Sequence, residues 1–385
     1  MELTLNRAAM QVELSGIRQF TYMVRDTPGA CALTIGEPDL NTPEAIKEAA
    51  KAALDDNDTH YPPGNGYPYT LEAISKFEAE QHGLHYSPDE ILLTVGATEA
   101  LFTAFQTICN PGDEVIIPVP SFVCYGPIVT MSCGKPVYVE TKAENEFRLT
   151  AEELKAAITP KTKLLVLPFP NNPTGGIMER EDLEAIAEVL RGTDIMILSD
   201  EIYSELSYGV HHVSPANIPE LYERTLVVNG FSKAYAMTGW RLGYVCGPKP
   251  LLSQMVKIHQ YGIMSAPTTS QYAAIEALKN GDEDIETMRK SYDSRRKLML
   301  KRLREIGLEC FEPKGAFYMF PSIKSTGPTS DEFCTRFLKE EKVAVIPGTA
   351  FGDCGEGYVR RCYAVSVENI EKAMSRMGDF IKRLK

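Results

Sequence analysis

One lysine of this sequence stands in surroundings that favour reaction with a carbonyl group. Lys233 lies in the segment NGFSKAYAMTGWRLGY, residues 229–244, which has small and aromatic neighbours and no acidic residue. Burial lowers the pKa of a lysine and yields a neutral amine, which can attack a carbonyl carbon. The alternative is a structural lysine at a strand end, whose alkyl stem covers apolar surface while its ammonium group reaches water.

A carboxylate and a phenol follow another apolar run, DIMILSDEIYSEL. Asp200 ends the predicted strand, and ligand sites of open α/β sheets lie at the carboxyl ends of strands. Tyr203 follows one helical turn later, so its hydroxyl can face the same side as the Asp200 carboxylate. The alternative for Asp200 is a helix N-cap, a frequent use of aspartate at such a junction.

Two turns can present further polar groups at fixed places. FPNNPTGG, residues 169–176, follows an apolar strand, and its Asn-Pro and Thr-Gly pairs favour a rigid turn that presents the Asn172 amide. In TVGATEALFTAF a strand ends and a helix begins, so the free N–H groups of Ala97 and Thr98 can bind an anion. The structural alternatives are an ordinary loop and a helix N-terminus that binds only water.

Arg360 can supply a carboxylate clamp. It lies in the otherwise apolar segment GYVRRCYA, and a guanidinium can pair with a carboxylate through two hydrogen bonds. If this segment is a strand, the neighbouring Arg361 points to the opposite face. The alternative for Arg360 is a surface arginine on an edge strand.

Together these residues match the needs of pyridoxal 5'-phosphate (PLP). Its aldehyde needs a lysine and its pyridine nitrogen an acidic partner, while its phosphate fits a helix N-terminus. The sequence also resembles the class I/II aminotransferases of the aspartate aminotransferase superfamily, PLP fold type I. The resemblance runs nearly end to end through the motifs IGEPDLNTPEAI, NNPTGG, SDEIY, SKAYAMTGWRLGY, GAFY, VIPGTAFG and VRRCYA.

The resemblance implies roles for the residues around the cofactor ring. Lys233 is similar to the lysine that forms the internal aldimine, and Asp200 to the carboxylate on the pyridine nitrogen. Tyr203 and Asn172 match the two donors to the 3-oxygen of the ring, and Phe122 matches the aromatic residue stacked over it. Lys233, Asp200 and Tyr203 are therefore the residues expected to take part in catalysis.

The resemblance also implies a phosphate site. Ala97 and Thr98 match the turn that cradles the phosphate, and Arg241 matches the arginine that pairs with it. The family often has a serine three residues before the lysine, where this sequence has Gly230, so Ser232 is the nearby hydroxyl expected to bind the phosphate.

On the substrate side, Arg360 is similar to the clamp for the substrate α-carboxylate, and Gly36 to the glycine that lines its site. Asn172 and Ile17 are expected to contact the substrate as well. Tyr61 resembles the tyrosine that reaches the phosphate from the neighbouring subunit. The resemblance therefore implies a homodimer with shared active sites.

The expected substrates are an L-amino acid, neutral or aromatic, and a 2-oxo acid such as 2-oxoglutarate. Thr98 stands where some aspartate-using relatives have a lysine, and Ile17, Tyr67, Phe122 and Tyr125 add no second basic residue. The resemblance implies a ping-pong aldimine/ketimine mechanism. The alternatives are a PLP-dependent β/γ-lyase or synthase of the same fold and a non-catalytic PLP-domain regulator. A serine hydrolase would need a G-x-S-x-G motif, which is missing.

Seven short apolar runs must position these groups, and they predict a mostly parallel sheet covered by helices. Between them lie helical patterns such as TPEAIKEAAKAALDD, where Thr42 is expected to be the N-cap. The predicted strands are Glu90 to Val95, Glu114 to Pro118, Lys135 to Glu140, Lys163 to Pro168, Asp194 to Ser199, Thr225 to Asn229 and Arg241 to Cys246.

The pattern changes near residue 285, where long charged helices give way to short strands mixed with helices. With the resemblance, this predicts an α/β protein of PLP fold type I. A three-layer α/β/α large domain with a mostly parallel mixed sheet spans residues 48–285. Residues 1–47 and 286–385 are expected to form a smaller, discontinuous α+β domain.

Composition excludes several other classes. The formal charge of -12 over 385 residues disfavours nucleic acid and acidic membrane surfaces as partners. The nine cysteines and six histidines lack metal-ligand spacing, so reduced, mostly buried thiols and no metal are expected. No apolar run approaches the roughly 20 residues of a membrane span. The first residues lack the apolar core of a signal peptide, so a cytoplasmic location is expected.

Overall fold

The seven predicted strands form one mixed sheet. In the computed structural model, which describes residues 5–14 and 16–384, the strand order is β2-β8-β7-β6-β5-β3-β4. All strands run in one direction except β8, which is antiparallel to β2 and β7. Each strand overlaps the run predicted for it. The strands are β2 (Ile91–Thr94), β3 (Glu114–Val119), β4 (Lys135–Glu140), β5 (Thr162–Leu167), β6 (Met196–Asp200), β7 (Thr225–Gly230) and β8 (Gly243–Cys246).

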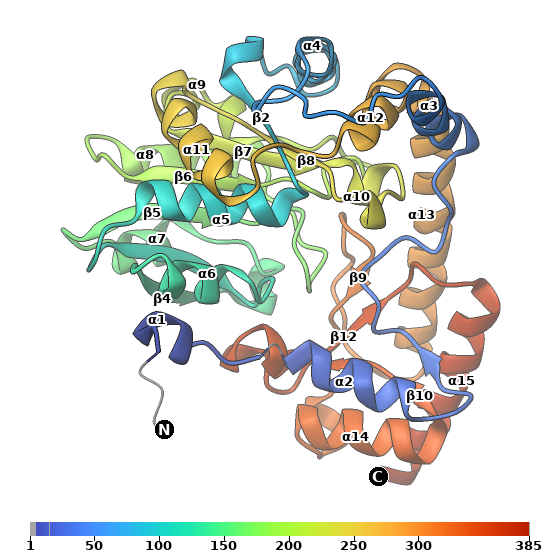
Figure 1. Ribbon diagram of the computed structural model, residues 1–385. Helices are drawn as coiled ribbons and strands as arrows, with labels where there is room; N and C mark the ends of the chain where they lie inside the picture. The colour runs from blue at the N-terminus through green and yellow to red at the C-terminus, as the bar shows by residue number, and fades with distance from the viewer. Residues whose placement is uncertain (1–4, 15, 385) are drawn as a thin grey trace.

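Helices cover both faces of this sheet (Figure 1). On β3, Val115 and Ile117 pack with α5, α6 and α11, whereas Ile116 between them packs with α7 and α8. Because both faces of β3 are buried, its residues form an almost continuous apolar run. The predicted three-layer α/β/α architecture is confirmed. The helices are α5 (Ala97–Ile108), α6 (Tyr125–Met131), α7 (Ala151–Ala157), α8 (Arg180–Leu190) and α11 (Lys249–Gly262).

Thr42 does not cap the next helix, contrary to the prediction. Helix α3 begins at Glu44, and no side chain caps its N-terminus. The Thr42 hydroxyl instead donates to the carbonyl oxygen of Ala236 at 2.7 Å and accepts from the Trp240 indole at 3.0 Å. Its hydrogen bonds therefore tie the N-terminal segment to the chain that follows Lys233. The helices beside β2 and β8 are α3 (Glu44–Asp55), α4 (Pro68–Phe77) and α12 (Thr268–Asn280).

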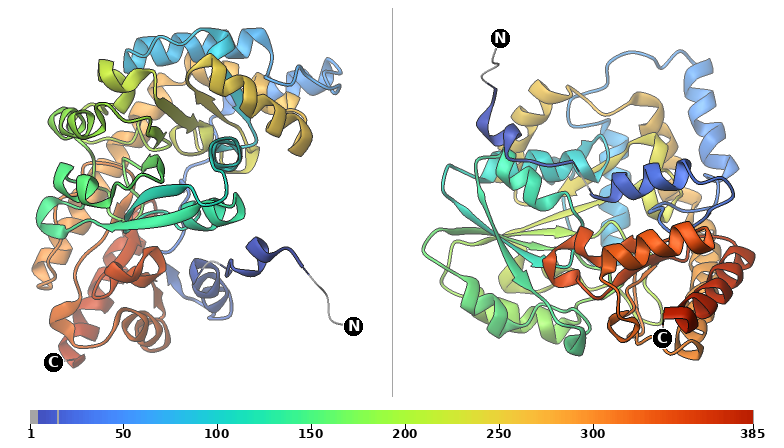
Figure 2. Two further views of the ribbon diagram at one scale, coloured as in Figure 1. Left: turned by 90° about the vertical axis from the view of Figure 1, so that its left-hand side faces the viewer. Right: turned by 90° about the horizontal axis from the view of Figure 1, so that it is seen from below.

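Both ends of the chain contribute to a second unit. Strand β1 pairs in parallel with β10, which brings Cys31 opposite Val343, and β11, β12 and β9 form an antiparallel sheet. Phe20 and Phe380 share one apolar cluster, and Figure 2 shows α2 beside the C-terminal helices. The elements are β1 (Cys31–Ala32), β9 (Tyr318–Met319), β10 (Val343–Ala344), β11 (Ile346–Pro347), β12 (Val359–Cys362), α2 (Gly16–Arg25), α13 (Asp282–Glu305), α14 (Ser330–Glu341) and α15 (Val367–Leu384).

We propose the domain division expected from the sequence, residues 48–285 against residues 1–47 and 286–385. Helix α13 runs through its boundary and so connects the two units. No helix within residues 5–14 and 16–384 is long and apolar enough to cross a membrane. The remaining short helices are α1 (Arg7–Met10), α9 (Pro219–Tyr222) and α10 (Phe231–Ala234).

Arg361 is fully buried on the face of β12 opposite Arg360. Its Nη1 and Nη2 groups contact the sulfur atoms of Met374 and Met377 on α15. Its Nε has no hydrogen-bond partner among the described residues. Burial lowers the pKa of this guanidinium. Because an unpaired buried charge is costly, Arg361 should reduce the stability of the fold.

Arg361→Met is therefore expected to raise the free energy of unfolding by about 2 kcal/mol, since methionine keeps an unbranched stem and removes the charge. Chemical denaturation of the variant and the unmodified protein measures this. Arg296→Met is the matched control, because Arg296 is also buried but pairs with Asp293 and Glu312, each at 2.9 Å. That control should lose stability. An equal loss in both variants would contradict the prediction for Arg361.

Candidate active site

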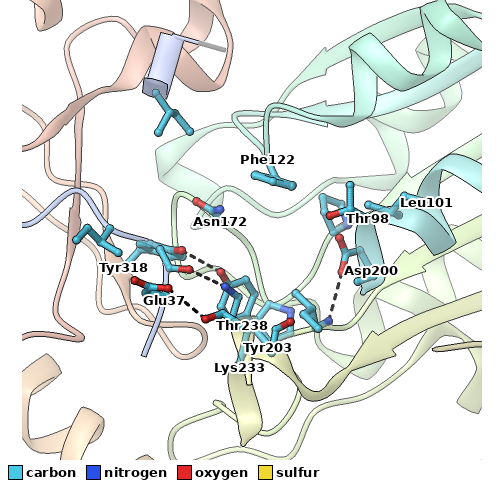
Figure 3. A pocket seen from close by; sticks show the side chains of 18 of the residues that line it. Glu37, Thr98, Leu101, Phe122, Asn172, Asp200, Tyr203, Lys233, Thr238 and Tyr318 are labelled. Atoms are coloured by element: carbon cyan, nitrogen blue, oxygen red, sulfur yellow. Dashed lines mark hydrogen bonds between the residues drawn. The ribbon is translucent and has the colours of Figure 1, made fainter. Parts of the chain in front are cut away.

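A cavity of about 520 Å³ lies at the carboxyl ends of the sheet strands and extends to the second unit. Figure 3 shows its side chains around one space, with Phe122 across from Lys233 and Tyr203. Every site residue expected from the sequence lines it except Tyr61. These residues are Ile17, Gly36, Ala97, Thr98, Phe122, Asn172, Asp200, Tyr203, Ser232, Lys233, Arg241 and Arg360.

Lys233 sits on the single turn of α10, directly after β7. Its Nζ donates a hydrogen bond to the carbonyl oxygen of Gly36 at 2.6 Å and lies 5.8 Å from the centre of the Tyr203 ring. Burial lowers the pKa of Lys233 to about 8. Lys233 is only partly exposed, and its amine lies within the cavity rather than on the outer surface. Its amine is prepared to react as a nucleophile or a base.

Asp200 ends β6 inside the cavity. The chain after it forms hydrogen-bonded turns and no helix, so Asp200 is not a helix N-cap. Its Oδ2 accepts from the Tyr125 hydroxyl at 2.7 Å, and its Oδ1 accepts from the Ile202 N–H at 3.3 Å. Burial raises the pKa of this carboxyl group. A cation next to Asp200 would therefore be strongly stabilised.

Tyr125 and Tyr67, which the sequence assigned to the substrate side, differ in their relation to the cavity, because Tyr125 lines it and Tyr67 does not. The Tyr125 hydroxyl is used by Asp200, and Tyr125 is buried. Tyr67 lies outside the cavity at the start of α4, where its ring stacks on Tyr69 at 4.9 Å. The apolar character of the wall comes instead from residues such as Ile35 and Leu101.

Tyr203 meets an aromatic residue that sequence reasoning left without a role. Its hydroxyl lies 2.9 Å from that of Tyr318, which comes from β9 in the second unit. Burial raises the pKa of Tyr203 well above its usual range and raises that of Tyr318 as well, so both hydroxyls are protonated and can donate. Tyr318 belongs to the GAFY motif, and this motif was the only sign of it in the sequence.

Arg360 is buried on the central strand of its sheet, so the alternative of a surface arginine on an edge strand is wrong. Its Nη1 donates to Asn172 Oδ1 at 2.9 Å, and its Nη2 donates to the Thr34 carbonyl at 2.6 Å. The guanidinium also lies 4.5 Å from the centre of the Tyr318 ring. Among the described residues its Nε has no partner. A buried cation without a carboxylate partner favours an anionic ligand.

The start of α5 and Arg241 form an anion-binding corner. Gly96, at φ 76°, precedes the helix, and a Cβ there would lie 2.4 Å from Arg241 Nη2. Glycine therefore lets the guanidinium approach the N–H groups of Ala97 and Thr98. Ser232 lines the same cavity. Helix N-terminus, guanidinium and hydroxyl together suit a phosphate group.

The residues present fit PLP. A buried amine, a buried carboxylate, an anion-binding corner and an aromatic ring surround one cavity, and Gly36 leaves room beside it. A Cβ at Gly36 would lie 2.6 Å from the Tyr318 hydroxyl. The donors match the aldehyde, the pyridine nitrogen and the phosphate of this cofactor in turn.

Comparison with known proteins decides the family. The family model described as aminotransferase class I and II matches residues 30–377. The chain belongs to this family. It is 47% identical to an aspartate aminotransferase of Pyrococcus abyssi over 97% of both chains. It is also 44% identical to aromatic-amino-acid aminotransferase 2 of Thermococcus litoralis over the whole of both chains.

Solved structures agree with this membership. The Thermus thermophilus aspartate aminotransferase with maleate matches with a TM-score of 0.94 and 40% identity, covering 98% of this chain and 100% of that one. The fold is thus PLP fold type I. The aminotransferase is a PLP-dependent transferase that acts on amino acids.

Proposed function

We propose that this aminotransferase takes its amino group from L-amino acids with neutral or aromatic side chains and passes it to a 2-oxo acid such as 2-oxoglutarate. The observation that carries the proposal is the composition of the cavity. Among its described lining residues, the cations are Lys233, Arg241 and Arg360. In this proposal Lys233 binds the cofactor aldehyde, Arg241 the cofactor phosphate and Arg360 the substrate α-carboxylate. The apolar residues that remain for a side chain include Ile17, Ile35 and Leu101.

When bound, PLP supplies an aldehyde carbon and an electron-withdrawing ring. Ala97, Thr98, Ser232 and Arg241 would hold its phosphate, Asp200 its pyridine nitrogen, Tyr203 and Asn172 its ring oxygen, and Phe122 its ring face. The negative charge of Asp200 keeps a proton on that nitrogen and stabilises negative charge that develops at the substrate α-carbon.

Three residues of the chain act on the substrate in this proposal. Arg360 binds the α-carboxylate through its guanidinium, next to Gly36 and Asn172. The Lys233 amine accepts the proton from the α-carbon and later returns it, because burial lowers its pKa to about 8 and so provides neutral amine near that pH. The amino donor and the 2-oxo acid use the same site in turn, which is a ping-pong scheme.

Transamination is favoured over the alternatives. The relatives described above are aminotransferases, whereas a lyase releases ammonia or a thiol without needing a 2-oxo acid. A regulator would need a DNA-binding surface, and the charge of -12 opposes that. The cytoplasmic location stays a prediction from the sequence.

The proposal predicts that kcat/KM is at least about tenfold higher for phenylalanine than for aspartate, since an unpaired distal carboxylate against an apolar wall is costly. A panel of amino donors with 2-oxoglutarate and pyruvate as acceptors measures it. Thr98→Lys is the matched variant, because it introduces the cation that some aspartate-using relatives have. It should bring the kcat/KM values for phenylalanine and aspartate closer together. Turnover that needs no 2-oxo acid and releases ammonia would contradict transamination.

We also propose a homodimer with shared active sites. Tyr61 does not line the cavity of its own chain, and 84% of its surface is exposed. The pocket beside Tyr61 is also lined by Ile263, which is exposed, and its neighbours in the chain Tyr261 and Met264 are exposed as well. A second copy that covers this surface would bring Tyr61 to the neighbouring phosphate site. Sedimentation equilibrium tests this proposal, because a homodimer has twice the mass of one chain.

A further inference from the structure

A buried histidine connects the phosphate end of the cavity to the loop that carries Tyr61. His259 lies on α11, which packs beside α5 (Figure 1), and its side chain has no exposed surface. One ring nitrogen, Nδ1, lies 2.7 Å from Glu99 Oε1. The other, Nε2, lies 3.0 Å from the carbonyl oxygen of Gly64.

The partners determine where the protons lie. A carbonyl oxygen only accepts, so His259 Nε2 carries a hydrogen. The Glu99 carboxylate already accepts from the Val95 N–H at 2.6 Å and from the Thr103 hydroxyl at 3.3 Å. Both ring nitrogens of His259 thus face oxygen atoms that accept, and a histidine that donates from both nitrogens carries a positive charge. His259 and Glu99 therefore form a buried imidazolium–carboxylate pair.

Glu99 holds the turn that precedes α5. It lies in the first turn of this helix, and its bond to the Val95 N–H fixes the backbone immediately before Gly96. Its charge, however, lies one residue from Thr98. An uncompensated carboxylate there would repel the phosphate that the turn is proposed to bind. The imidazolium offsets this charge while leaving the hydrogen bond to Val95 in place.

The second contact of His259 fixes the proline-rich loop. Gly64 lies three residues after Tyr61, in the segment YPPGNGYPY. The loop is also held by a hydrogen bond from the Leu93 N–H to the Asn65 carbonyl at 3.0 Å. His259 is thus the side chain through which this loop is joined to the first turn of α5.

We propose that His259 is a positioning residue for the cofactor phosphate. Its imidazolium offsets the charge of Glu99 next to the turn of Ala97 and Thr98. Its hydrogen bond to Gly64 keeps the loop that carries Tyr61 in a fixed position relative to that turn. This inference rests on the proposed phosphate role of Ala97, Thr98 and Arg241. It adds a residue that touches neither substrate nor cofactor.

The test compares two ligands of the cofactor-free protein, PLP and pyridoxal, which lacks the phosphate. In His259→Gln the Glu99 charge is uncompensated, so the dissociation constant for PLP should rise roughly tenfold. Pyridoxal affinity should stay unchanged. Glu99→Gln with His259→Gln removes both charges and should recover part of the loss. His85→Gln, which alters an exposed histidine, is the matched control and should change neither affinity.

Equal losses for PLP and pyridoxal, or no recovery in the double variant, would overturn the proposal. If His259→Gln fails to fold, Glu99→Gln alone is informative, because it removes the repelling charge and should not weaken PLP relative to pyridoxal. A selective loss for PLP in Glu99→Gln would therefore also overturn it. Failure of the proposed phosphate site looks different, since the unmodified protein would then bind pyridoxal as tightly as PLP.

Discussion

Lys233→Ala is expected to abolish transamination, with a loss of at least about 10⁴-fold in kcat, since it removes both the nucleophile and the base. The variant should also lose the visible absorbance of covalently attached cofactor. The reason lies in the position of the amine, which burial keeps at a pKa of about 8 and which the Gly36 carbonyl holds at 2.6 Å. Absorbance spectra and a coupled assay with 2-oxoglutarate measure the two effects.

Lys279→Ala, which alters an exposed lysine on α12, is the control and should keep full activity. A pH series adds a second readout. Because only the neutral amine reacts, the rate of cofactor attachment to cofactor-free protein should rise with pH and level off above about 8. Normal turnover by Lys233→Ala would refute the proposed role.

Asp200→Asn is expected to reduce kcat by about 10³-fold, because it removes a preorganised charge from a buried site while keeping the shape of the side chain. Asparagine can still accept from the Tyr125 hydroxyl, so the fold should survive. Cofactor affinity should fall as well, since the carboxylate no longer faces the pyridine nitrogen. Steady-state kinetics and a cofactor titration measure both effects.

Tyr125→Phe is the graded comparison for Asp200. It deletes the 2.7 Å hydrogen bond but leaves the carboxylate, so its loss should stay within about tenfold. If both variants lost the same activity, the hydrogen bond rather than the charge would be the important feature. An Asp200→Asn enzyme with more than a tenth of normal kcat would argue against the pyridine-nitrogen role.

Much of the fold could be predicted from the sequence, because its signals are local. A buried strand is an apolar run of a few residues, and each of the seven predicted runs overlaps a strand of the large sheet, although the edge strand β4 is largely exposed. The motifs around Lys233, Asp200 and Asn172 are local as well, since each lies at or shortly after the end of one strand. The groups that PLP requires could therefore be identified from the sequence without knowing which residues are neighbours in space.

Hydrogen-bond partners could not be predicted in the same way. Thr42 looked like a helix cap but bonds to Ala236, and nothing in the sequence indicated that the Tyr125 hydroxyl donates to Asp200. Tyr318 and His259 carried no local sign of their partners. In each case the partner lies on a different element, brought close by packing.

The sequence by itself determined the elements, the family and the types of group that do the chemistry. Only the tertiary structure decided which groups meet: Lys233 with Gly36 across 197 positions, and Arg360 with Asn172 across 188. It also decided that Arg360 is buried with no carboxylate partner among the described residues and that Tyr61 lies outside the cavity of its own chain. The physical reason is that periodicity and turn propensity act over a few residues, whereas burial and pairing depend on packing of the whole chain.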